Sequence, residues 1–67
     1  MNYTALKEMI ENRHINITSL ARSLGMSRVT LGHKLNGYSD FKLTEIRGIT
    51  KELRLTEAER DHIFFEQ

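Results

Sequence analysis

The sequence contains no cysteine, proline or tryptophan, and only 7% of its residues are aromatic. Without cysteine, neither a disulfide framework nor a thiolate metal site can form, which fits a reducing cytoplasm. No apolar run approaches the roughly 20 residues that span a bilayer, and Lys7 and Glu8 interrupt the early apolar segment, so that it cannot serve as the core of a signal peptide. We therefore expect one small domain, residues 1–67, located in the cytoplasm and without a membrane partner.

Acidic residues are also missing between Asn12 and Ser39, a stretch that nevertheless carries the basic residues Arg13, Arg22, Arg28 and Lys34. The net charge of +1 hides this asymmetry, because residues 1–40 hold five basic and three acidic side chains, whereas residues 41–67 hold five and six. A surface that neutralises phosphates needs locally unopposed Lys and Arg. The distribution of charge therefore indicates nucleic acid as a partner.

Because no proline marks the breaks, helix boundaries are predicted from caps and from apolar periodicity. Asn16 and Ser27 are expected N-caps, and Thr56 and Glu59 form a capping box. Gly25 suits the left-handed conformation that follows a helix end. Together these signals predict an all-α bundle of five helices, over about residues 3–13, 17–24, 28–35, 43–53 and 57–66.

The second and third predicted helices meet across the turn at Gly25. The small side chain of Ala21 allows the two helices to cross closely, and Leu31 and Leu35 anchor the third helix from beneath. A helix presented in this way has about the width that the major groove of DNA admits. A hairpin that merely packs is the alternative, but it does not explain the missing acids. The outer face of the third helix is expected to carry Ser27, Arg28, Val29, Gly32 and His33.

The segment from Ile17 to Gly37 resembles the helix-turn-helix of the Cro and CI repressor superfamily. Residues outside this segment are similar to those of small Cro-like proteins encoded by temperate phages of Gram-positive hosts: Tyr3, Leu6, Phe41, Glu45, Ile46 and Ile63 to Phe65. The resemblance covers nearly the whole chain. It implies an operator-binding domain of a lysis–lysogeny switch, working in the cytoplasm of a bacterial host. Some small proteins of such switches instead bind the CI-type repressor and modulate repression, and this alternative stays open.

The resemblance also implies roles for individual positions. Arg28 matches the residue that hydrogen-bonds a guanine edge, and Val29 matches one that touches a thymine methyl. Phosphate contacts position such a protein on the duplex without reading its sequence. The base-contacting set is Arg28, Val29, Gly32 and His33, and the phosphate-contacting set is Ser27, Lys34, Asn36, Lys42 and Arg22.

Two positions depart from the pattern of the family. Ile17 stands where many relatives have a Gln that bridges phosphate and recognition helix, and Gly32 offers no side chain to a base. With Val29, they would form a smooth patch of the kind that suits contact with a protein. Ile17 is therefore an expected partner contact.

Neither catalysis nor metal binding has support in the sequence. His14, His33 and His62 fall on different predicted elements without a convergent pair of carboxylates, so that neither zinc-site nor triad spacing is present. We expect no enzyme activity, metal or cofactor. Adjacent helical residues point about 100° apart, so we expect Phe64 to face inward and Phe65 to form a partner or homodimer contact.

Overall fold

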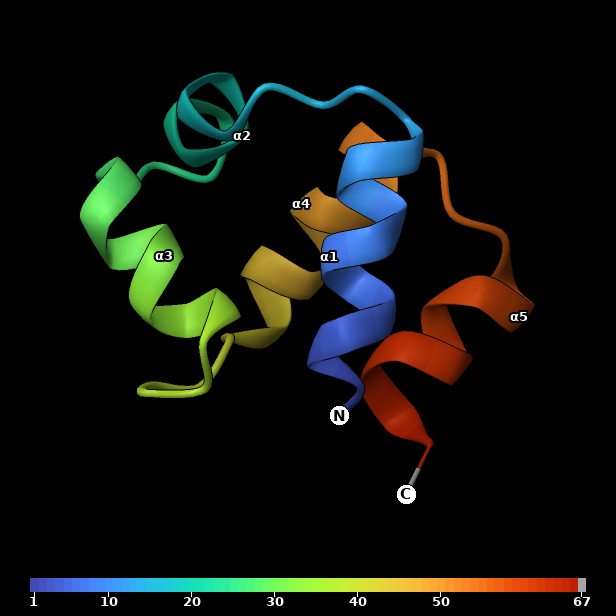
Figure 1. Cartoon of the computed structure of the whole chain (residues 1–67). Helices are drawn as coiled ribbons and strands as arrows, with labels where there is room; N and C mark the ends of the chain where they lie inside the picture. Colours follow the sequence, from blue (N-terminus) through green and yellow to red (C-terminus); the bar gives the residue numbers. More distant parts are fainter. Residues whose placement is uncertain (67) are drawn as a thin grey trace.

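The computed structural model describes residues 1–66, and its regular structure is helical throughout. The elements are α1 (Tyr3–Asn12), α2 (Ile17–Ser23), α3 (Arg28–Leu35), α4 (Leu43–Leu53), α5 (Glu57–Arg60) and a π-helical segment, η1 (Asp61–Phe65). In Figure 1, α2 and α3 lie on one side of the molecule and α5 and η1 on the other, with α1 and α4 between them. The predicted all-α fold of five helices is confirmed, and the first four helices end within one residue of their predicted bounds.

The last helix differs from the prediction of one continuous α-helix over residues 57–66. The α5 helix ends at Arg60, and the Glu66 N–H donates to the Asp61 carbonyl at 2.8 Å, which closes the wider π turn. No cap or glycine marks this change in the sequence. The segment directs Phe64 into the core, as predicted, and leaves Phe65 54% exposed.

Local signals in the sequence fix the starts of the helices. The N-caps Asn2, Asn16 and Ser27 each accept a hydrogen bond from the backbone N–H three residues further on, over 2.9–3.1 Å. Gly25 has a φ of +72°, in the left-handed region that glycine tolerates best. These features set the turn between α2 and α3.

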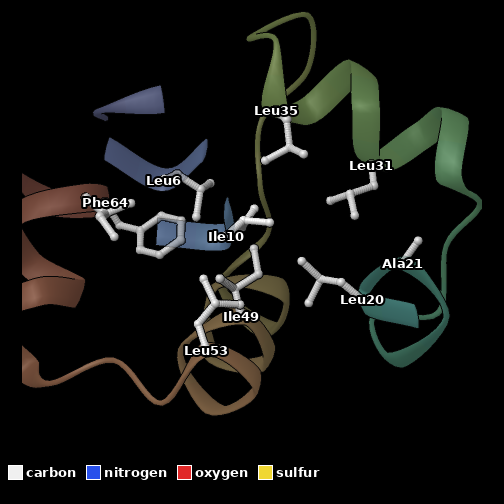
Figure 2. Close-up of a cluster of buried hydrophobic side chains, with 10 residues drawn as sticks. Leu6, Ile10, Leu20, Ala21, Leu31, Leu35, Ile49, Leu53 and Phe64 are labelled. Atoms are coloured by element: carbon white, nitrogen blue, oxygen red, sulfur yellow. The ribbon is translucent and has the colours of Figure 1, made fainter. Parts of the chain in front are cut away.

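One apolar core unites all the elements except α5 (Figure 2). In Figure 2, Leu31 and Leu35 point from α3 toward the side chains of α1, α2 and α4. Since Leu31 is fully buried and Leu35 is 7% exposed, the opposite side of α3 must face outward. No helix within residues 1–66 combines the length and the apolar character needed to cross a membrane. The buried apolar residues are Leu6, Ile10, Leu20, Ala21, Leu31, Leu35, Ile49, Leu53, Ile63 and Phe64.

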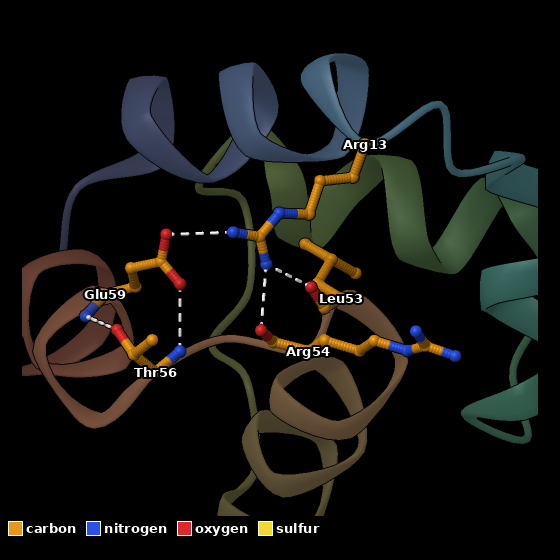
Figure 3. A network of polar contacts seen from close by, with 5 residues as sticks. All are labelled: Arg13, Leu53, Arg54, Thr56 and Glu59. Carbon is orange, nitrogen blue, oxygen red and sulfur yellow. Dashed lines mark hydrogen bonds and ion pairs between the residues drawn. The ribbon is translucent and has the colours of Figure 1, made fainter.

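Arg13, which follows α1, forms polar contacts with the end of α4 and with α5 (Figure 3). Its guanidinium donates to the carbonyls of Leu53 and Arg54 at the end of α4, and Nη2 lies 2.9 Å from Glu59 Oε2. Carbonyls at a helix C-terminus have no partner within the helix, so Arg13 satisfies groups that would otherwise need water. The backbone N–H of Thr56, together with Arg13, holds the pKa of Glu59 below its ordinary value despite partial burial.

Candidate nucleic-acid interface

The outward side of α3 carries the residues that the sequence analysis places there. We call this surface, formed by Ser27, Arg28, Val29, Gly32 and His33, the α3 face. All of its members are exposed except Gly32, which is intermediate, and the Val29 side chain is 68% exposed. A helix whose inner positions are held by leucines thus presents a guanidinium, a branched apolar group and an imidazole to the outside.

The hydroxyl of Ser27 is committed to the start of α3. It accepts from the Thr30 N–H at 3.1 Å and donates to Thr30 Oγ1 at 3.0 Å. A hydroxyl has one hydrogen to donate. Ser27 can therefore donate to a phosphate only if it breaks its hydrogen bond to Thr30 Oγ1. The Thr30 hydroxyl keeps its own hydrogen and is exposed, which makes it a donor that the sequence analysis missed.

Lys34, expected to contact a phosphate, is instead buried between α3 and α4. It is 8% exposed, and its Nζ lies 2.6 Å from Glu45 Oε1, which also accepts from the Lys42 N–H at 2.9 Å. Burial alone would raise the pKa of Glu45, but the hydrogen bonds from Lys34 and Lys42 and their positive charges outweigh burial and lower it. Paired and buried in this way, Lys34 does not present its ammonium for contact with a phosphate.

The other predicted phosphate contacts lie on the surface. Arg22 and Lys42 are exposed and form no ion pair with any residue from Met1 to Glu66. Asn36 is exposed at the end of α3, where its Oδ1 accepts from Lys7 Nζ at 2.8 Å. Lys7 is thus a further cation beside α3. The sequence analysis missed it because 29 positions separate it from Asn36.

Of the four basic residues in the acid-free stretch, two are neutralised by the second half of the chain. Arg13 pairs with Glu59 and Lys34 with Glu45. Only Arg22 and Arg28 remain without an ion pair inside the described part of the chain. The positive surface around α3 is therefore smaller than the sequence pattern suggests.

Tyr38 extends the α3 face beyond the end of the helix. It is 79% exposed, its N–H donates to the His33 carbonyl at 2.9 Å, and its ring meets the His33 ring edge-on with centroids 6.0 Å apart. A phenol placed in this way can donate to a phosphate. The sequence analysis left Tyr38 in a polar loop, because its contact with His33 depends on the turn at Gly37, where φ is +81°.

The two predicted partner contacts lie on elements at opposite sides of the molecule, Ile17 on α2 and Phe65 on η1 (Figure 1). Ile17, at the start of α2, is half-buried and packs against the core, so that only part of its side chain is available. Phe65 is exposed on η1, on the other side of the molecule from α3 (Figure 1). The structure therefore does not bring Ile17 and Phe65 into one surface.

Gly32 is not required by packing. A Cβ built at this position meets no atom within 4 Å, and φ is not positive. Gly32→Ala should therefore raise the free energy of unfolding by about 1 kcal/mol through helix propensity, seen as a rise in Tm of roughly 4–8 °C in thermal unfolding followed by circular dichroism. Gly37→Ala is the control and should lower Tm, because alanine is strained at φ +81°. A lower Tm for Gly32→Ala would contradict this geometry.

Metal-binding clusters are not found in the described residues, where no three His, Asp or Glu side chains gather to hold an ion. His62 Nδ1 lies 3.0 Å from Glu66 Oε2 on the surface, one turn apart.

Comparisons of the chain with protein-family models, with curated proteins and with solved structures find no match.

Proposed function

We propose that this protein is a transcriptional regulator of phage or prophage type that binds operator DNA by placing α3 in the major groove. The observation that carries the proposal is the α3 face. Arg28, Val29 and His33 are exposed together on a short helix whose opposite side is locked into the core. A regulator of this kind would act in a lysis–lysogeny switch.

Each exposed group has a chemical counterpart in DNA. The Arg28 guanidinium can donate two parallel hydrogen bonds to O6 and N7 of a guanine, and Val29 can contact a thymine methyl. His33 lies one turn further along and would reach a neighbouring base edge or phosphate. Cations and neutral donors around α3 would fix the position of the helix through phosphates; they are Lys7, Arg22, Lys42, Thr30, Asn36 and Tyr38.

The salt dependence of binding tests the proposal directly. Titration of fluorescent genomic and random duplexes by anisotropy should show a linear fall of log K with log salt concentration. For three or four phosphates neutralised per subunit, the slope should be about −3 to −4, at roughly 0.9 per phosphate. An affinity that stays constant between low and physiological salt would exclude groove binding.

Arg28→Ala should weaken binding to the preferred duplex by about 1–3 kcal/mol and relax the preference at one base pair. Lys51→Ala, which removes an exposed cation on α4 that has no ion pair with residues 1–66, is the matched control and should leave both affinity and preference unchanged. The measurement is competition between duplexes that differ at single positions. An equal loss on every sequence would reassign Arg28 to a phosphate contact.

A second candidate function is modulation of repression, in which the α3 face binds a CI-type phage repressor. It is favoured by the exposed Val29, the open surface at Gly32 and the pairing of Arg13 and Lys34 with carboxylates, which leaves fewer cations for phosphates. Val29→Lys separates the candidates, because a charge in an apolar contact should weaken binding to a protein, whereas on DNA the added cation should strengthen sequence-independent binding while the preference for thymine is lost. Size-exclusion chromatography of the protein mixed with the cognate repressor supplies the readout. Two independent peaks at micromolar concentration would remove this candidate.

A further inference from the structure

An apolar groove lies between α4 and the α5–η1 segment and shares no residue with the α3 face. Leu43 and Phe65 contribute large apolar side chains that are 55% and 54% exposed. On α4, the lining positions recur every three or four residues, so that they form one stripe beside the core stripe of Ile49 and Leu53. The groove is lined by Leu43, Ile46, Arg47, Thr50, Arg60 and Phe65.

The charged side chains that line this groove are Arg47 and Arg60, of which only Arg47 lacks a carboxylate partner among the described residues. Arg47 is exposed and has no ion pair with any described residue, whereas Arg60 donates from Nε and Nη2 to Asp61 Oδ1 at 3.1 and 3.0 Å. Within residues 1–66, no carboxylate lines the groove itself. An apolar floor bordered by arginines favours a ligand whose apolar side chains are flanked by carboxylates.

A second copy of this chain fits the groove less well. A two-fold contact would bring the same surface of both copies together, and the unpaired Arg47 of each copy would then face a groove whose described lining offers it no carboxylate. Like charges brought together at an interface oppose association. The charge pattern therefore argues for a different chain as the occupant.

We propose that this groove binds an acidic amphipathic segment of a partner protein. A large apolar side chain of the segment, such as Leu or Phe, packs between Leu43 and Phe65, and flanking carboxylates pair with Arg47. Phe65, expected from the sequence to contact a partner, is the apolar wall of this site. The proposal does not depend on the proposed function, because the α3 face stays open when the groove is filled.

The experiment uses two fluorescein-labelled helical peptides of 14 residues. Both carry Leu or Phe at positions i, i+3, i+4 and i+7; one has Glu at the intervening positions and its charge twin has Lys. The Glu peptide should bind the full-length protein with micromolar Kd in an anisotropy titration, and the Lys twin at least tenfold more weakly. Phe65→Ser should weaken binding of the Glu peptide at least tenfold. Arg47→Glu should weaken it similarly and invert the preference toward the Lys twin. Val29→Ser, which removes an apolar group of the α3 face that is more exposed than Phe65, should change neither Kd.

Because Phe65, Arg47 and Val29 are all exposed, each variant should fold. Circular dichroism checks that it does. Equal affinity for the two peptides, no binding of the Glu peptide, or unchanged binding by Phe65→Ser overturns the proposal. Sedimentation equilibrium adds a further readout. A dimer that Phe65→Ser dissociates would show that the occupant is a second copy. Displacement of the peptide by duplex DNA would show that the groove belongs to the nucleic-acid surface. Either result also overturns the proposal.

Discussion

Glu45→Ala should lower the free energy of unfolding by about 3–5 kcal/mol, because it leaves the Lys34 ammonium buried without its partner. The side chains of Lys34 and Glu45 are only 10% and 12% exposed, and their charged atoms are 2.6 Å apart. A domain of this size has a total stability of about 3–10 kcal/mol. The loss should therefore remove roughly a third or more of the total stability, seen as a lower midpoint in urea denaturation.

A control and a rescue variant separate this effect from general damage to α4. Glu52→Ala removes an exposed carboxylate from the same helix and should change stability by less than about 0.5 kcal/mol. The double variant Lys34→Met/Glu45→Leu replaces both partners with apolar groups and should recover most of the stability. A Glu45→Ala variant as stable as Glu52→Ala would show that the pair contributes little.

The same pair makes stability depend on pH in a defined direction. The pKa of Glu45 is lower in the folded protein than its ordinary value of 4.5. The folded state thus keeps the carboxylate charged where the unfolded chain already binds a proton. Its contribution is complete above about pH 4.5 and is lost as the pH falls through the folded pKa. In urea unfolding, Glu45→Gln should reduce this acid-dependent loss, and the part that remains should include that of Glu59, whose pKa is lowered in the same direction.

Leu31→Ala should lower the free energy of unfolding by about 2–5 kcal/mol, since it empties a fully buried position in the middle of α3. Val29→Ala, two positions away and on the opposite side of the same helix, should change it by less than about 0.5 kcal/mol. The contrast measures the orientation of α3, on which the proposed interface depends. Urea denaturation of both variants, with Gly32→Ala as an internal reference for helix propensity, is sufficient.

Comparable losses for Leu31→Ala and Val29→Ala would mean that α3 buries both sides, and the α3 face would then not be available to DNA or to a repressor. Val29→Ala should also reduce the binding of DNA or of a repressor to the α3 face without reducing stability.

Much of this fold follows from short-range signals. Asn16 and Ser27 start α2 and α3, Gly25 makes the turn, and the leucines of both helices recur at helical spacing. Such signals lie within four residues of the structure that they determine, so the sequence alone predicts the helix-turn-helix and the outward placement of Arg28.

The features that the sequence does not predict depend on long-range packing. Lys34 lies three positions after Leu31, on the inner face, but its residue type suggested the surface; its partner Glu45 follows a loop whose path no local rule determines. Arg13 forms its ion pair with Glu59, which lies 46 positions later in the chain. The π-helical turn at η1 likewise has no cap or glycine signal in the sequence, and it contains the buried Ile63 and Phe64.

The two ion pairs that cross the molecule give the uneven charge of the chain a role in assembly. Arg13 and Lys34 belong to the acid-poor half, and their partners Glu59 and Glu45 are synthesised after it. An emerging polypeptide that stops short of Glu45 holds every helix of the candidate interface, yet must keep Lys34 in water. The last third of the chain thus supplies the carboxylates that neutralise Arg13 and Lys34, and neither ion pair can form before Glu45 and Glu59 are present.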